Sequence, residues 1–88
     1  MIRKRVVVFG RVQGVFFRDS CRHAAQRHEV AGWVTNRDDG SVEAVFEGDD
    51  TAVRAMIAWV RHGPPQAQVT HVDVTDELPE GMTDFSVR

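Results

Sequence analysis

The residues best suited to chemistry lie at positions 8–18, which read Val-Phe-Gly-Arg-Val-Gln-Gly-Val-Phe-Phe-Arg. Gly10 and Gly14 bracket a loop, and glycine permits backbone angles and close approaches that a Cβ would block. Successive N–H groups of such a loop can converge on one anion, and the start of a following helix adds free donors. Arg18 ends the loop with a planar guanidinium that suits phosphate or carboxylate. The stretch therefore predicts a site for a phosphate-sized anion.

Each of these features also has an ordinary structural interpretation. An arginine at the start of a helix is usually a solvated surface residue, and the pair Gly10 and Gly14 can mark no more than a tight connection. We favour the anion site because Arg18 closes a glycine-containing loop that comes directly after a β-branched run at residues 6–8. That order of strand, loop and helix start is what surrounds an anion with donors.

Asn36 is the second residue that can contribute to chemistry. It begins the sequence Asn-Arg-Asp-Asp-Gly, which is ordinary turn composition, so its local context alone favours a structural role. The fold predicted below brings the end of its strand close to the start of the first helix, so Asn36 and Arg18 can face one pocket. An amide offers a donor and an acceptor, and it can orient a water molecule without carrying charge.

A phosphate site with a neutral amide and no obvious general acid favours one class of substrate. Hydrolysis of a phosphate monoester expels an alkoxide, which usually requires an acid or a metal. An acyl phosphate releases a carboxylate with a pKa of about 4, which leaves without a proton. A loose phosphoryl-transfer transition state also asks little of the water nucleophile, so positioning and charge stabilisation can suffice. The residues match a mixed carboxylic–phosphoric anhydride better than other phosphorylated substrates.

The remaining reactive side chains favour structural roles. His23 and His28 are five residues apart, which does not align them on one helix face, and His62 and His71 fall in separate elements. Cys21 lies on an apolar helix face, where a buried and inert thiol is usual. We therefore expect no metal site and no nucleophilic cysteine.

The aromatic residues divide between the core and the loop. Trp33 and Trp59 are expected in the core rather than as platforms for a ligand. Phe16 and Phe17 are expected to anchor the loop, and one of them can form a wall of the pocket.

The hydrophobic pattern predicts the elements that position these residues. A buried strand is expected at residues 4–10 and a helix at 19–28, with Cys21, Ala24, Ala25 and His28 on its apolar face. The remaining expected elements are a strand at 30–35, a turn at 36–40, a half-buried strand at 41–47, a helix from 49–51 to the Gly-Pro-Pro at 63–65, a strand at 69–74 and a short closing strand at 85–87.

The order of elements is β-α-β-β-α-β, with the short strand last. Two helices cannot cover both faces of a four-stranded sheet, so the predicted fold is a ferredoxin-like α+β sandwich. It has an antiparallel sheet of four to five strands and both helices on one face. In that topology the second strand lies beside the third, and the third beside the first, which brings Asn36 toward Arg18.

Length and charge limit the class of protein. At 88 residues we expect one domain, spanning 1–88. The net charge is −2, which disfavours nucleic acid as a partner. One cysteine excludes an internal disulfide and a cysteine-based zinc cluster. Without an apolar signal region or a run of about 20 apolar residues, we expect a cytoplasmic protein with no membrane partner.

Two stretches of the chain resemble the signatures of a known family. Residues 8–18 closely resemble the first signature of the acylphosphatases, and residues 32–42, with Gly48 six residues on, are similar to the second. The likeness covers nearly the whole chain, including its length and the order of its elements. The chain departs from the family at Thr35, where a basic or longer residue is more common, and it has no tyrosine.

The resemblance implies hydrolysis of small-molecule acyl phosphates to a carboxylate and inorganic phosphate, without metal, cofactor or covalent intermediate. By position in the motifs, Arg18 would bind the phosphoryl group and stabilise developing charge, and Asn36 would orient the attacking water. Backbone N–H groups of the loop would complete the cradle. The residues expected to bind phosphate are Arg11, Val12, Gln13, Gly14, Val15, Phe16 and Arg18.

Three alternatives remain open at this point. RNA-recognition domains share the architecture and stack bases on aromatics of the two central strands, where this chain offers Phe9 and Phe46. A non-catalytic anion sensor or carrier would need the same loop. The third is the acylphosphatase-like module of larger carbamoyl-transfer proteins. For a free-standing acylphosphatase, a monomer is the simplest expectation.

Overall fold

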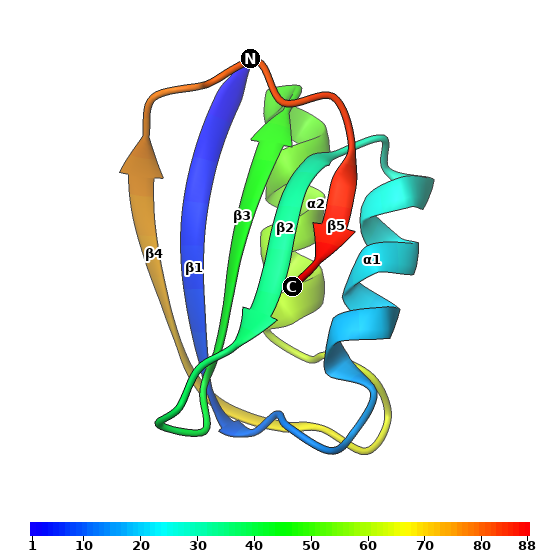
Figure 1. The fold of residues 1–88 in the computed structure, drawn as a ribbon, viewed down its shortest axis with the longest axis vertical. Helices are drawn as coiled ribbons and strands as arrows, with labels where there is room; N and C mark the ends of the chain where they lie inside the picture. The colour runs from blue at the N-terminus through cyan, green and yellow to red at the C-terminus, as the bar shows by residue number, and fades with distance from the viewer.

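A single five-stranded sheet with two helices makes up the computed structural model, which describes residues 1–88 (Figure 1). The order of strands across the sheet is β4-β1-β3-β2-β5. In chain order the elements are β1 (Ile2–Arg11), α1 (Phe17–Arg27), β2 (Ala31–Asn36), β3 (Val42–Gly48), α2 (Asp50–Val60), β4 (Gln68–Glu77) and β5 (Phe85–Val87). This is the predicted ferredoxin-like order, and the closing strand is present.

The sheet is mixed rather than wholly antiparallel. β1 pairs antiparallel with both β3 and β4, and β2 pairs antiparallel with β3, as predicted for four strands. β5 instead pairs parallel with β2. The reason is topological: β4 runs opposite to β2, so a chain that turns back after β4 must run in the same direction as β2. In Figure 1 the connecting segment crosses one end of the sheet to reach β5.

Alternating residues of the strands face the two helices and form the core. β1 contributes Val6 and Val8, β2 contributes Val34, and the central strand β3 contributes Ala44 and Phe46, all with no exposed surface. The helices cover this face with Cys21, Ala24 and Ala25 of α1 and Val53, Met56 and Val60 of α2. Both helices therefore lie on one face, which confirms the prediction (Figure 1).

Two residues predicted for the core differ in detail. His28 is not part of the buried stripe: α1 ends at Arg27, Glu29 takes a left-handed φ of 58°, and the Val30 N–H donates to the Ala25 carbonyl at 2.9 Å. That turn leaves His28 exposed at the end of the helix. Trp33 is buried, but it lies on the sheet face opposite the helices, under the guanidinium groups of Arg5 and Arg88.

Charged residues on that opposite face form a network, which the sequence pattern did not predict. Arg3 is 5% exposed and donates to Glu47 at 3.3 Å and to Glu77 at 2.8 Å. Arg5 donates to Glu77 at 2.6 Å and also pairs with Glu43. Paired charges therefore cover this face of the sheet together with buried Trp33.

Glu47 connects this network to the segment that leads into β5. Its carboxylate is 1% exposed and accepts the backbone N–H groups of Glu80, Gly81 and Met82 at 2.8–2.9 Å. Hydrogen bonds from these N–H groups, the Glu80 N–H above all, hold the pKa of Glu47 below its usual value against the opposing effect of burial. One carboxylate thereby fixes the loop that places β5 beside β2.

Candidate active site

The loop at residues 12–16, between β1 and α1, is held at both ends by buried side chains. Val12 and Val15 are each 1% exposed and anchor the loop in the core, whereas Gly14 and Phe16 face outward. Gly14 has a φ of +74°, and Phe16, which precedes the helix, has a φ of 64°. Positive φ is uncommon for an aromatic residue, and such conformations concentrate at functional sites.

Gly10 is required for a close backbone approach. A Cβ at this position would lie 2.1 Å from the carbonyl oxygen of Gln68 on β4, and the register of β1 against β4 shifts between Phe9 and Gly10. This irregularity comes directly before the loop. Gly10 therefore sets the path of the chain into the loop, while Gly14 supplies the positive φ inside it.

The backbone N–H groups of residues 13–16 donate to no group within the protein. The first N–H groups of α1 add to these free donors, because the first bond of that turn runs from Ser20 to the Phe16 carbonyl at 3.0 Å. Free donors at a helix start carry partial positive charge. The loop therefore offers the set of donors that an anion requires.

Gln13 has a side-chain role that the sequence pattern did not indicate. Its Nε2 donates to the carbonyl oxygens of Arg37 at 2.8 Å and Ser41 at 3.0 Å, in the turn between β2 and β3. Those bonds fix the loop against the end of β2, so Gln13 aligns the two segments that line the pocket.

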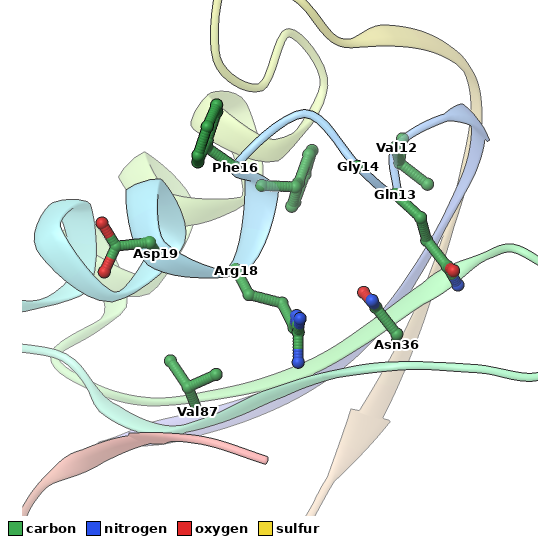
Figure 2. Close-up of a pocket in the computed structure, with 9 residues that line it drawn as sticks. Val12, Gln13, Gly14, Phe16, Arg18, Asp19, Asn36 and Val87 are labelled. Atoms are coloured by element: carbon green, nitrogen blue, oxygen red, sulfur yellow. The ribbon is translucent and has the colours of Figure 1, made fainter.

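Arg18 lies in the first turn of α1, and its exposed side chain extends over the pocket toward Asn36 (Figure 2). It forms no salt bridge with any carboxylate side chain; Nη1 donates only to the main-chain oxygen of Arg88 at 3.3 Å. The hydroxyl of Thr35 shares that acceptor at 3.4 Å. Most donors of the Arg18 guanidinium are therefore available to a ligand.

Asn36 is the last residue of β2 and lies on the helix-facing side of the sheet, two residues after buried Val34. Its side-chain amide has no hydrogen-bond partner within the protein, and Figure 2 shows it directed into the space between Gln13 and Arg18. The amide is thus half-buried and unpaired beside a guanidinium, with a donor and an acceptor both free.

These groups surround one pocket of about 370 Å³. Of the residues expected to bind phosphate, Arg11 and Val15 do not line it: Arg11 is exposed at the end of β1, and Val15 is buried beneath the loop. Phe17, Asp19 and Val87 line it although they were not predicted. The lining residues are Val12, Gln13, Gly14, Phe16, Phe17, Arg18, Asp19, Asn36 and Val87.

The three additional lining residues differ in how far sequence could reveal them. Phe17 and Asp19 flank Arg18, so their position next to it was the available signal. Val87 reaches the pocket only because β5 pairs parallel with β2, and no local pattern indicates that pairing. Phe17, 2% exposed, anchors the loop in the core as predicted, but Phe16, 74% exposed, does not, and both residues line the pocket rather than one.

No lining residue is a proton donor near neutral pH. The only carboxyl, Asp19, accepts a hydrogen bond from Arg22 at 2.9 Å, and this bond is the main reason that its pKa lies below the usual value. Figure 2 shows its side chain directed away from Arg18. The chemistry of the pocket is therefore that of backbone donors, one cation and one amide.

The other reactive residues lie away from the pocket. Cys21 is fully buried in the core, and burial raises the pKa of its thiol well above the ordinary value, so it is an inert core residue. The four histidines are exposed: His23 on α1, His28 directly after it, His62 after α2 and His71 on β4. No three His, Cys, Asp or Glu side chains are grouped as metal ligands are.

The structure argues against the RNA-binding alternative. Phe46 has no exposed surface because it faces the helices, and Phe9 stands beside His71 with ring centroids 5.8 Å apart. Across the open face, β1 and β3 carry the charged network instead of stacking platforms. In addition, neither helix has the length and apolar composition needed to cross a membrane.

Comparisons with known proteins point to one family. A model of the acylphosphatase family matches residues 4–87. An acylphosphatase of Gloeobacter violaceus is 57% identical over 86 residues, which are 98% of this chain and 92% of that protein. The crystal structure of acylphosphatase from Bacillus subtilis has a TM-score of 0.96 at 42% identity, and the match covers 100% of this chain and 99% of that one.

The fold also occurs as one part of a much longer protein. Full-length HypF, solved in its phosphate- and nucleotide-bound form, has a TM-score of 0.85 at 25% identity, but the match covers only 12% of HypF. The acylphosphatases of Gloeobacter violaceus and Bacillus subtilis match over almost their full lengths at much higher identity. With the family model matched from residue 4 to residue 87, this chain belongs to the acylphosphatase family of hydrolases.

Proposed function

We propose that this chain hydrolyses acyl phosphates to a carboxylate and inorganic phosphate, with Arg18 and the loop amides binding the phosphoryl group and Asn36 orienting the attacking water. One observation carries the proposal: free backbone donors of residues 13–16, a guanidinium with no acidic side-chain partner and an unpaired amide surround a single pocket. The family to which the chain belongs supports the same reaction.

The loop and Arg18 are suited to bind a phosphoryl group in the transition state of its transfer. In a loose transition state the negative charge spreads over three equatorial oxygens. Loop N–H groups and a two-pronged guanidinium can meet those oxygens from different directions, and they are held in place before the substrate arrives. Since Arg18 is paired with no acidic side chain, binding the phosphoryl group breaks no salt bridge to a side chain.

Asn36 suits the orientation of water. Its amide oxygen can accept a hydrogen bond from the water and so direct a lone pair of the water oxygen at phosphorus. A metaphosphate-like transition state requires little activation of the nucleophile, and the carboxylate leaves without a proton. Positioning by an amide is then sufficient, which is consistent with a pocket whose one carboxyl, Asp19, is ionised and turned away.

A single copy of this chain is proposed to carry out the reaction. We take residues 1–88 as one acylphosphatase-like domain that acts as a monomer on small-molecule acyl phosphates. The reaction as written needs neither a metal nor another cofactor, because each step is assigned to a group of the pocket. Nucleic acid has no part in it.

The test is hydrolysis of benzoyl phosphate in excess EDTA by the wild type, Arg18→Ala and Asn36→Ala. We expect metal-independent turnover by the wild type and near-complete loss in Arg18→Ala. Asn36→Ala should lower kcat about 100-fold while retaining affinity for inorganic phosphate, because the amide acts mainly in the transition state. Arg54→Ala, which removes an exposed arginine of α2 paired with Asp50, is the matched control and should retain full activity.

Two results would contradict the proposal. Full turnover by folded Asn36→Ala would exclude the role of that residue. If the folded wild type binds inorganic phosphate in calorimetry but hydrolyses no acyl phosphate, the chain is a non-catalytic anion-binding protein instead.

A further inference from the structure

Exposed apolar side chains mark one side of the pocket. Five large apolar residues are exposed in the structure, and two of them, Phe16 and Val87, line the pocket. Phe16 is 74% exposed and has a φ of 64°, a backbone conformation that is costly for an aromatic residue. The fold therefore holds a phenyl ring in water, in an unfavourable conformation, at the edge of the candidate phosphoryl site.

The geometry of displacement decides which part of a substrate would meet this ring. If Asn36 orients the water, as in the proposed function on which this inference rests, the leaving oxygen departs on the opposite side of phosphorus, because attacking and leaving groups are in line. Figure 2 shows Phe16 and Asn36 on opposite sides of the pocket, with the Arg18 side chain extending from α1 toward Asn36. The acyl group is then directed toward Phe16.

A second hollow continues the surface beyond Phe16. It measures about 220 Å³ and is lined by Val15, Phe16, Ser20, Pro64, Pro65 and Gln66, so Phe16 forms a wall of both spaces. Two prolines, Val15 and Phe16 make up four of its six lining residues, and none of the six carries charge. An apolar chain leaving the phosphoryl site could extend over this surface without desolvating an ion.

The far wall of the hollow is held rigidly against α1. Gly63 lies so close to the start of the helix that a Cβ there would be 2.7 Å from Cε2 of Phe17. The Gly63 N–H donates to the Trp59 carbonyl at 2.8 Å, and the Ala67 N–H to the Pro64 carbonyl at 2.9 Å. The hollow therefore exists before any substrate binds, which lowers the cost of using it.

We propose that Phe16 and the adjoining hollow bind the acyl group of the substrate, and that they make this acylphosphatase selective for acyl phosphates with aromatic or extended apolar acyl groups. Acetyl and carbamoyl phosphate present almost no surface to Phe16 and gain nothing from the hollow. A phenyl or hexyl group covers the exposed ring and removes its apolar surface from water. The enzyme would therefore distinguish substrates by how tightly it binds the acyl leaving group, and the loop and Arg18 that bind the phosphoryl group would not contribute to this selectivity.

The test compares selectivity rather than activity. The measured quantity is the ratio of kcat/KM for benzoyl phosphate to kcat/KM for acetyl phosphate. Phe16→Asn removes the ring with a residue that tolerates the left-handed backbone, and it should lower this ratio about tenfold. Phe16→Leu should retain most of the ratio. Gln66→Leu, which extends the apolar lining of the hollow, should raise kcat/KM for hexanoyl phosphate about threefold relative to acetyl phosphate.

Leu78→Asn is the matched control, because Leu78 is 86% exposed and lines neither space. It should leave the ratio unchanged. An unchanged ratio in Phe16→Asn, with both substrates still hydrolysed, would overturn the acyl-group site and leave the proposed function intact. Failure of the folded wild type to hydrolyse either substrate would overturn both.

Discussion

Arg18 is the only cationic side chain that lines the pocket, and its shape matters as much as its charge. A guanidinium can donate two parallel hydrogen bonds to a phosphoryl group, whereas an ammonium acts as a point charge. Arg18→Lys should therefore lower kcat/KM for benzoyl phosphate about 100-fold while the far-ultraviolet circular dichroism stays native. If the lysine variant kept wild-type kcat/KM, charge alone would account for the role of this position.

Gly10 illustrates how a residue outside the pocket can determine its geometry. Gly10→Ala would place a Cβ against the backbone of β4, and backbone cannot yield as a flexible side chain does. We expect a loss of about 3 kcal/mol in the free energy of unfolding, measured by urea denaturation.

The matched control for this substitution is Gly40→Ala in the turn between β2 and β3. Gly40 also has a positive φ, of +93°, but an added Cβ there meets no atom within 4 Å. Its cost should be only the strain of the backbone, about 1 kcal/mol. Equal losses in the two variants would show that close approach of β1 to β4 is not what selects glycine.

At the scale of elements, Glu47 determines where β5 lies. Glu47→Gln would leave buried N–H groups facing an amide that carries donors of its own, and it would remove one partner of buried Arg3. We expect a loss of about 3 kcal/mol in the free energy of unfolding by urea denaturation.

Glu80→Gln is the control for the Glu47 substitution. Glu80 also lies near Arg3, with a separation of 3.4 Å between Nη2 and Oε2, but its side chain is 68% exposed. Its loss should cost at most about 0.5 kcal/mol. A similarly small effect of Glu47→Gln would mean that the segment before β5 is held by other contacts.

Much of this arrangement of elements could be predicted from the sequence, because it rests on local patterns. Alternation along β3 and the helical spacing of Val53, Met56 and Val60 indicate which residues face the core. The prediction that β3 is only half-buried was wrong, because Val45 and Glu47 on its other face are also buried. The pairing of β5 and the role of Glu47 could not be predicted. Each depends on residues that are distant in sequence, and an acidic residue in a strand normally indicates the solvent side.

In the candidate site, too, some features could be predicted from local sequence patterns and others depend on long-range contacts. Arg18 and Gly14 fall in a stretch of unusual composition, whereas Asn36 begins an ordinary turn sequence, and the predicted topology brings the three residues to one pocket. Val87 joins them through long-range pairing, and the side-chain bonds of Gln13 to Arg37 and Ser41 depend on a turn 24 or more residues away. Local patterns and topology therefore predict polar residues that line the pocket, but not the residues that hold the pocket in shape.

At the scale of the whole molecule, the carboxylates of the charged network make stability depend on pH in a defined direction. The pKa values of Glu47 and Glu77 are lowered from 4.5, mainly by backbone N–H groups for Glu47 and by Arg3 for Glu77. A lowered pKa stabilises the fold fully above the unfolded value, and the stabilisation is lost as the pH falls through the folded value.

The free energy of unfolding should therefore stay nearly level from neutral pH to about pH 5 and decrease steadily below it. Urea denaturation at a series of pH values measures this. Glu47→Gln should reduce the acid-dependent decrease, whereas Glu29→Gln, at an exposed position outside the network, should not. An identical pH dependence in the wild type and Glu47→Gln would exclude Glu47 as a source of the effect.

The Arg3–Glu77 pair, which bridges residues 74 positions apart, also has a consequence for how the protein folds. β1 can pair with β4 only after two segments near opposite ends of the chain come into contact. Contacts this distant in sequence slow folding because closing a long loop costs conformational entropy. We expect α1, α2 and the hairpin of β2 and β3 to form early, and the outer strands to join last. Since Val87 and the segment held by Glu47 belong to that last step, a nascent or partly folded chain has a loop with free amides but no finished pocket.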